Sequence, residues 1–155
     1  LVRLHEEMEL EFRPDFVPGV HEALAALHKR YKQAVISDAI FSPGRCLRTL
    51  LADEGLLSYF DAFIFSDEIG YSKPAPIVFK TAMEKLGLAA HELVHIGDRE
   101  HNDILGPRQA GMHALLCTAA VDRGAANSSA DAVFNDYGRL PELVDALNRK
   151  EENGK

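Results

Sequence analysis

The sequence predicts an open α/β sandwich of the Rossmann-like class, in which helices cover both faces of a parallel sheet. Two features of the sequence predict it. Short apolar runs rich in β-branched residues alternate along the chain with segments whose apolar residues have helical spacing. The short runs are also almost continuously apolar, as a strand buried on both faces requires.

Five apolar runs are predicted as strands, namely residues 33–37, 62–65, 93–96, 113–117 and, more weakly, 132–134. Five helices are expected between and after them, at residues 19–30, 43–53, 76–86, 102–110 and 141–148. Residues 151–155 are expected to form a disordered tail, because they are polar and end the chain.

The composition argues against several classes of partner. The 155 residues, 46% hydrophobic and 26% charged, correspond to about one ordinary globular domain. The formal net charge of −7 argues against nucleic acid or an anionic membrane as the main partner. No apolar run approaches the roughly 20 residues that span a bilayer, and the start lacks the apolar core of a signal peptide. We therefore expect a cytoplasmic protein, with Cys46 and Cys117 as reduced, buried thiols.

Polar residues of interest follow the predicted strands, at the carboxyl edge where ligands bind in open sheets. Ser37 and Asp38 end the first strand, and the Ser37 hydroxyl could donate a hydrogen bond to a phosphoryl oxygen. The same pair could simply begin a turn. Lys73, held by Pro74, follows the second strand and could neutralise a phosphate or lower the pKa of a nearby aspartate. A solvated loop lysine is the alternative.

Two aspartates follow the third strand, Asp98 directly and Asp103 at the start of the next predicted helix. Paired carboxylates at a strand end suit Mg²⁺, a hard cation that takes oxygen ligands and keeps water and substrate phosphate. The alternative is that Asn102 or Asp103 only caps the helix. The histidines show no metal-binding spacing such as HExxH, and we expect surface or core-edge positions for four of them: His91, His95, His101 and His113.

In order and placement, these motifs resemble the haloacid dehalogenase-like (HAD) hydrolases, and the resemblance covers essentially the whole chain. The motifs that carry it are Ser37-Asp38, Lys73-Pro74, Gly97-Asp98 with Asn102-Asp103, and Ala110-Gly111-Met112. The resemblance implies that Ser37 binds the transferred phosphoryl group and that Lys73 stabilises the nucleophile and phosphate. It implies that Asp98 and Asp103 hold Mg²⁺, and that Asp38 positions its loop and belongs with Ser37 and Lys73 to the substrate-binding site. Arg99, where many relatives have a small hydroxyl residue, receives no role.

One element of that family is absent from the sequence, the DxDx[TV] motif that supplies the aspartate nucleophile and the general acid and base. None of the eleven aspartates has a second aspartate two residues on. We therefore interpret residues 1–12 as a remnant of the helical cap and residues 13–150 as a HAD-like core that lacks the family's first central strand. A segment preceding Leu1 is the favoured way to complete the sheet. A second copy of the chain, or direct pairing of the two flanking strands, is the alternative.

The resulting prediction is a Mg²⁺-dependent phosphatase that acts on a small phosphorylated metabolite in its complete form, with this chain alone inactive. A hydrolytic dehalogenase is less favoured, because a metal-free enzyme needs no paired carboxylates. A naturally shortened, inactive module that binds a phosphorylated ligand or a protein partner is the alternative from another class. A response-regulator receiver domain has similar groups, but in a different order along the chain.

Overall fold

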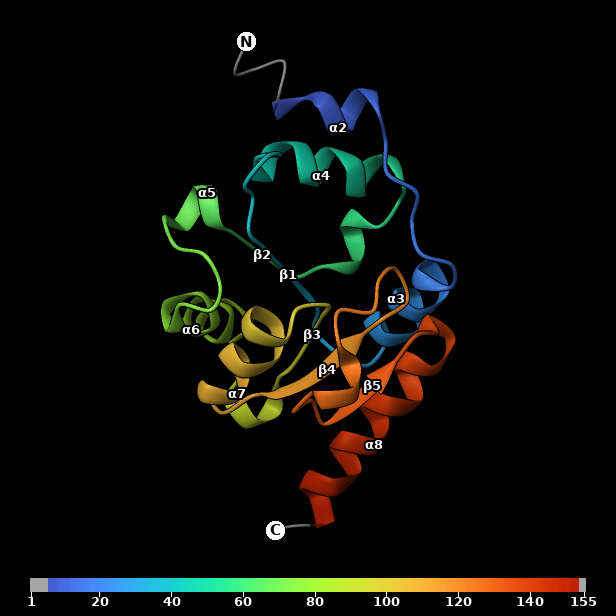
Figure 1. The fold of residues 1–155 in the computed structure, drawn as a ribbon, viewed down its shortest axis with the longest axis vertical. Helices are drawn as coiled ribbons and strands as arrows, with labels where there is room; N and C mark the ends of the chain where they lie inside the picture. The colour runs from blue at the N-terminus through green and yellow to red at the C-terminus, as the bar shows by residue number, and fades with distance from the viewer. Residues whose placement is uncertain (1–5, 154–155) are drawn as a thin grey trace.

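The strands run parallel as predicted, but they form two sheets in the computed structural model, which describes residues 6–153 (Figure 1). Strand β1 (Ala34–Ser37) pairs with β2 (Ala62–Phe65). Strand β3 (Val94–Gly97) pairs with β4 (His113–Cys117), which pairs with β5 (Ala132–Phe134). Each strand lies within one residue of its predicted bounds.

Helices connect the strands in the predicted alternation. The α-helices are α2 (Met8–Glu11), α3 (Val20–His28), α4 (Gly44–Asp53), α5 (Ser66–Ile69), α6 (Pro76–Leu86), α7 (Gly106–Gln109) and α8 (Leu140–Asn153). Single 3₁₀ turns occupy Leu57–Tyr59, Ala90–Glu92, Ala125–Asn127 and Tyr137–Arg139. No helix in the described residues has the length and apolar character that a bilayer span requires.

Two helical predictions need correction. The single helix expected at residues 102–110 is a π-helix, Glu100–Leu105, followed by the short α7. Helix α8 continues to Asn153, so residues 151–153 are helical where we expected a disordered tail. Residues 154–155 lie outside the described residues, as do residues 1–5 of the proposed cap remnant.

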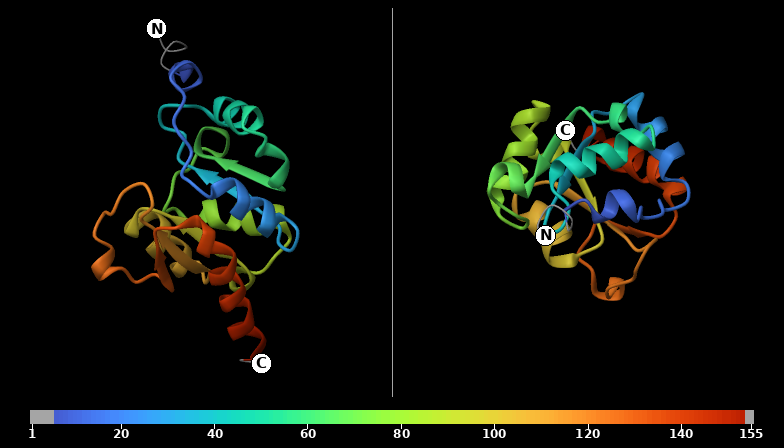
Figure 2. Two further views of the ribbon diagram at one scale, coloured as in Figure 1. Left: turned by 90° about the vertical axis from the view of Figure 1, so that its right-hand side faces the viewer. Right: turned by 90° about the horizontal axis from the view of Figure 1, so that it is seen from above.

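Helices lie on opposite sides of the strands (Figures 1 and 2), and the apolar core has two main parts. On one side, α6 packs Val78 and Phe79 with Ile64 of β2. Pro76 suits the first turn of this helix, and Gly87 ends it in the left-handed conformation. On the other side, buried residues of α3 and α8 form one apolar cluster with Leu115 of β4 and Phe134 of β5.

An apolar space of about 860 Å³ separates the two sheets. Residues 34–36 of β1 and 94–96 of β3 line it, together with apolar side chains from α3, α6 and α8. Strand β1 bonds to β2 alone and β3 bonds to β4 alone in the described part of the chain. The two strands expected to flank a missing strand therefore do not close on each other, and what occupies the space stays a prediction.

We expect this break in the sheet to be measurable by hydrogen exchange. Strand β4 is bonded on both sides, whereas β1 and β3 each have one neighbour. Alternate amides of β1 and β3, those directed at the space, should therefore exchange faster than the amides of β4, because they lack a strand partner. Residue-resolved exchange on the 155-residue chain measures this. Protection in β1 and β3 as high and as continuous as in β4 would contradict the break.

Candidate active site

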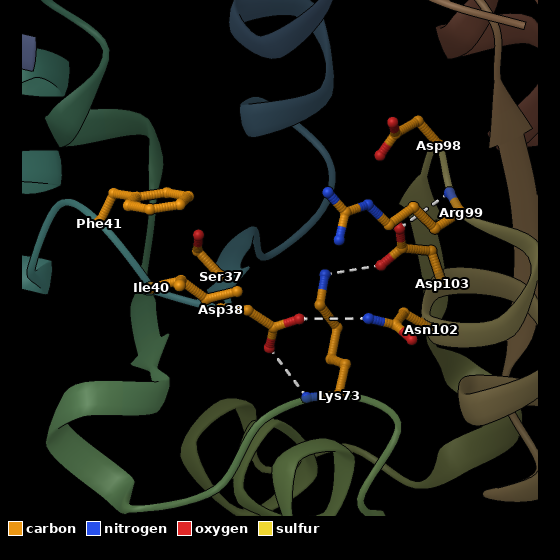
Figure 3. A pocket seen from close by; sticks show the side chains of 9 residues that line it. All are labelled: Ser37, Asp38, Ile40, Phe41, Lys73, Asp98, Arg99, Asn102 and Asp103. Atoms are coloured by element: carbon orange, nitrogen blue, oxygen red, sulfur yellow. Dashed lines mark hydrogen bonds and ion pairs between the residues drawn. The ribbon is translucent and has the colours of Figure 1, made fainter. Parts of the chain in front are cut away.

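The five predicted site residues come together in one pocket of about 240 Å³ at the carboxyl ends of β1 and β3 (Figure 3). Ser37 and Asp38 come from the end of β1, and Lys73 from the loop that precedes α6. Asp98 follows β3, and Asp103 lies in the π-helix. The convergence expected from the sequence is therefore present, while the chemical role of each residue stays a prediction.

Asp103 is the centre of this cluster, with a residue exposure of only 3%. Its Oδ1 accepts from Lys73 Nζ at 2.6 Å and lies 3.1 Å from His95 Nε2. Its Oδ2 accepts from the backbone N–H of Arg99 at 3.1 Å. Burial acts to raise the pKa of Asp103, but the His95 hydrogen bond and the Lys73 charge outweigh it and hold this pKa well below its ordinary value. Asp103 is therefore a buried anion that fixes Lys73.

Close packing at Gly97 makes this position of Asp103 possible. A Cβ atom at Gly97 would overlap the carboxyl group and Cβ of Asp103. The π-helix that begins at Glu100 brings Asp103 back onto the strand end, where the backbone of Arg99 bonds to it. A short π-helix of this kind is often found at functional sites.

The Lys73 loop is held from a second side by Asp38. Asp38 Oδ1 accepts from the backbone N–H of Lys73 at 2.8 Å, and its Oδ2 lies 3.4 Å from Asn102 Nδ2. The Lys73–Pro74 peptide bond is cis. The loop-positioning role implied for Asp38 is consistent with these contacts. The hydroxyl of Ser37 has no hydrogen-bond partner among residues 6–149 and faces the pocket (Figure 3).

Asp98 lies in a different environment from Asp103. Its side chain is 40% exposed, and Oδ2 accepts from Nε of Arg123 at 2.8 Å, which leaves Oδ1 without a protein donor in the described part of the chain. Within residues 6–153, no group of three or more histidine, cysteine or acidic side chains is placed to hold a metal. Mg²⁺ usually takes one or two carboxylates from the protein and completes its coordination shell with water and phosphate. Asp98, together with Oδ2 of Asp103, fits such a site with two protein ligands.

His95 is a part of the cluster that the sequence did not reveal. We expected it at the surface or at the edge of the core, but it is 7% exposed and packs edge-on against Phe79. Burial lowers the pKa of His95, and the hydrogen bond to Asp103 does not reverse this effect. Because the Asp103 carboxylate can only accept hydrogen bonds, Nε2 of the His95 ring is the donor in this contact. The sequence offered one signal for the burial of His95, namely that it is a lone polar residue inside an apolar strand.

Comparison with known proteins agrees with this geometry. A family profile described as "Haloacid dehalogenase-like hydrolase" matches residues 1–117. A phosphoglycolate phosphatase from Photobacterium profundum is 35% identical over 130 residues, covering 81% of this chain and 55% of that protein. The chain thus spans about half the length of the curated relatives it matches.

Two solved structures show the same architecture. A HAD phosphatase from Thermococcus onnurineus is 30% identical, with a TM-score of 0.77 over 89% of this chain and 63% of that one. A 2-haloacid dehalogenase from Pseudomonas syringae is 28% identical, with a TM-score of 0.71 over 86% of this chain and 55% of that one. Proteins named for two reactions therefore share this fold.

The two aspartates should differ in their effect on stability. Asp103→Asn removes the charge that compensates Lys73, whose side chain is 12% exposed, and breaking such a buried pair costs about 3–5 kcal/mol. Asp98→Asn, the matched control, changes an exposed pair worth about 0–1 kcal/mol. Denaturant unfolding of the two variants measures the difference. Equal losses would mean that Asp103 does not anchor the site.

Proposed function

Because the chain belongs to the haloacid dehalogenase-like hydrolases, we propose that the whole protein is a Mg²⁺-dependent phosphohydrolase that acts on a small phosphorylated metabolite. The observation that carries the proposal is the fixed position of Lys73, between Asp38 and Asp103 in a pocket that Ser37 also lines. An ammonium group and a free hydroxyl that line one small cavity can both donate hydrogen bonds to the oxygens of a phosphoryl group.

The residues of this chain would bind and orient the phosphoryl group. Lys73 Nζ donates one N–H to Asp103 and has two more N–H groups that can donate to phosphoryl oxygens. The Ser37 hydroxyl can donate a third hydrogen bond from the opposite side of the pocket. Because the Lys73 loop is fixed by Asp38 at its backbone and by Asp103 at its side chain, the Lys73 donors are held in place before substrate binds.

Mg²⁺, when bound, would neutralise charge on the phosphoryl oxygens. Asp98 would be its principal ligand, because its carboxylate is half-exposed in the pocket wall and Oδ1 has no donor in residues 6–149. Asp103 can contribute only through Oδ2, since Oδ1 faces both Lys73 and His95. Of the two predicted ligands, we therefore infer that Asp98 makes the stronger contribution.

The nucleophile would come from the element that occupies the space between the sheets. Strand β1 ends at Ser37 and β3 ends at Gly97, both beside the pocket. A parallel strand between them would deliver the residue that follows it to the same place. We propose that a segment preceding Leu1 supplies this strand and a carboxylate nucleophile, and that the 155-residue chain alone does not turn over a phosphate ester.

A dehalogenase is the second candidate, since one similar solved structure has that name. The paired aspartates favour the phosphohydrolase, because a metal-free dehalogenase needs no such pair. An inactive module that binds a phosphorylated ligand would use the same Ser37 and Lys73, and differs only in lacking turnover.

Activity of the whole protein tests the proposal. It should hydrolyse p-nitrophenyl phosphate with Mg²⁺ and lose this activity when the metal is chelated. Asp98→Ala should lower kcat/KM about a hundredfold or more, since it removes charge stabilisation at the reacting group. Asp53→Ala, on the surface away from the pocket, is the matched control.

Three outcomes would contradict the proposal: activity without metal, turnover of 2-haloacids in place of phosphate esters, or strong phosphatase activity of the isolated 155-residue chain.

The strand proposal has its own measurement. If a segment of the whole protein fills the space, alternate amides of β1 and β3 should be more protected from hydrogen exchange there than in the 155-residue chain. Amides of β4, already bonded on both sides, should change little and serve as the control. Unchanged exchange in β1 and β3 would contradict a filling strand, and a concentration-dependent rise in the isolated chain would indicate a second copy instead.

A further inference from the structure

The side chain of Arg99 lines the same pocket and takes no part in the proposed binding of phosphate or Mg²⁺. Its backbone N–H bonds to Asp103 Oδ2, which fixes where the side chain starts. From there the side chain extends into the pocket toward the side of Ser37 (Figure 3). Its guanidinium has no hydrogen bond or ion pair with any group in the described part of the chain.

The other charges of the pocket are already compensated. Lys73 is bonded to Asp103, and Asp98 to Arg123. Asp38 accepts from the Lys73 backbone and lies near Asn102. Arg99 is therefore the pocket-lining cation without an acidic partner in residues 6–149, although the chain has 24 acidic residues and a net charge of −7. Such an arginine is placed to receive an anion from the ligand.

The two cations of the pocket lie at different depths. The Lys73 side chain is 12% exposed at the floor, whereas Arg99 is exposed. If the phosphoryl group binds at Lys73, as proposed above, the rest of the substrate extends toward the mouth and past Arg99. A cavity of about 240 Å³ lies below the roughly 300–1,000 Å³ of pockets for drug-sized ligands, so that remainder is short.

We propose that Arg99 determines substrate class, by binding a second anionic group of a small phosphate monoester. This inference rests on the proposed function of the same site. The planar guanidinium offers paired N–H donors that match a carboxylate or a phosphate, so the second group is one of these two. Across the pocket, Ile40 and Phe41 are about two-thirds exposed and apolar, and provide no competing charge.

The experiment uses the whole protein and three esters built on the same two carbons. These are 2-phosphoglycolate, with a carboxylate, the bisphosphate of ethylene glycol, with a second phosphate, and 2-hydroxyethyl phosphate, with no second charge. We expect kcat/KM to favour one of the two charged esters over 2-hydroxyethyl phosphate. Arg99→Gln should reduce that preference about tenfold or more, as the loss of a charge-assisted hydrogen bond does.

Two further variants define the effect. Arg99→Lys should retain part of the preference, because it keeps the charge and loses the paired donors. Arg139→Gln, which makes the same substitution at an exposed position away from the pocket, should leave the preference unchanged. The charged ester whose advantage disappears in Arg99→Gln identifies the second anion as carboxylate or phosphate.

The failure of this inference differs from the failure of the proposed function. An equal loss for all three esters in Arg99→Gln would mean that Arg99 serves the phosphoryl group, and would overturn the inference, as would a preference that does not change. Absence of turnover with every ester would contradict the proposed function. Calorimetric titration of wild type and Arg99→Gln with the same three esters then decides whether Arg99 selects the second anion.

Discussion

The buried ion pair between Lys73 and Asp103 is the interaction on which the pocket depends. It joins the loop that precedes α6 to the π-helix that follows β3. The loop comes after β2 of one sheet, and β3 belongs to the other sheet. Removing two charges from water is costly, and such a pair is favourable only when further hydrogen bonds satisfy the remaining groups. Here the His95 ring and the Arg99 backbone supply those bonds to the carboxylate.

The same contacts explain how the pocket keeps its shape although the sheet is divided. Strands β1 and β3 do not bond to each other, so no ladder sets the distance between Ser37 and Asp98. Asp38 instead reaches from β1 to the Lys73 backbone, and Lys73 reaches on to Asp103 beside β3. This polar chain crosses the carboxyl edge of both sheets, and its packing requires a glycine at residue 97.

The local sequence pattern predicted the strands well. A strand that is buried on both faces must be a short, continuously apolar run, and few other elements have that pattern. The local sequence pattern did not predict the π-helix, since the apolar spacing of residues 102–110 does not distinguish one extra residue per turn from an α-helix. His95 and Arg123 were missed for a different reason. Their partners Asp103 and Asp98 lie 8 and 25 residues away, and those contacts exist only once the chain has folded. For Ser37 and Lys73, the local sequence pattern allowed a role at phosphate but equally a turn or a solvated lysine, and the family resemblance favoured the role at phosphate.

The groups proposed to bind phosphate and the group proposed to attack it are held by different parts of the fold. Lys73 is held by Asp38 and Asp103 within the described chain, so the ammonium group proposed to bind phosphate is positioned without any contribution from the space between the sheets. The apolar lining of that space, by contrast, exposes the edges of β1 and β3 to whatever occupies it. A strand placed there would gain main-chain hydrogen bonds on both sides and would end beside Ser37 and Lys73. Binding of phosphate and chemistry at phosphorus would then depend on separable parts of the fold, joined at the carboxyl edge where β1 and β3 both end.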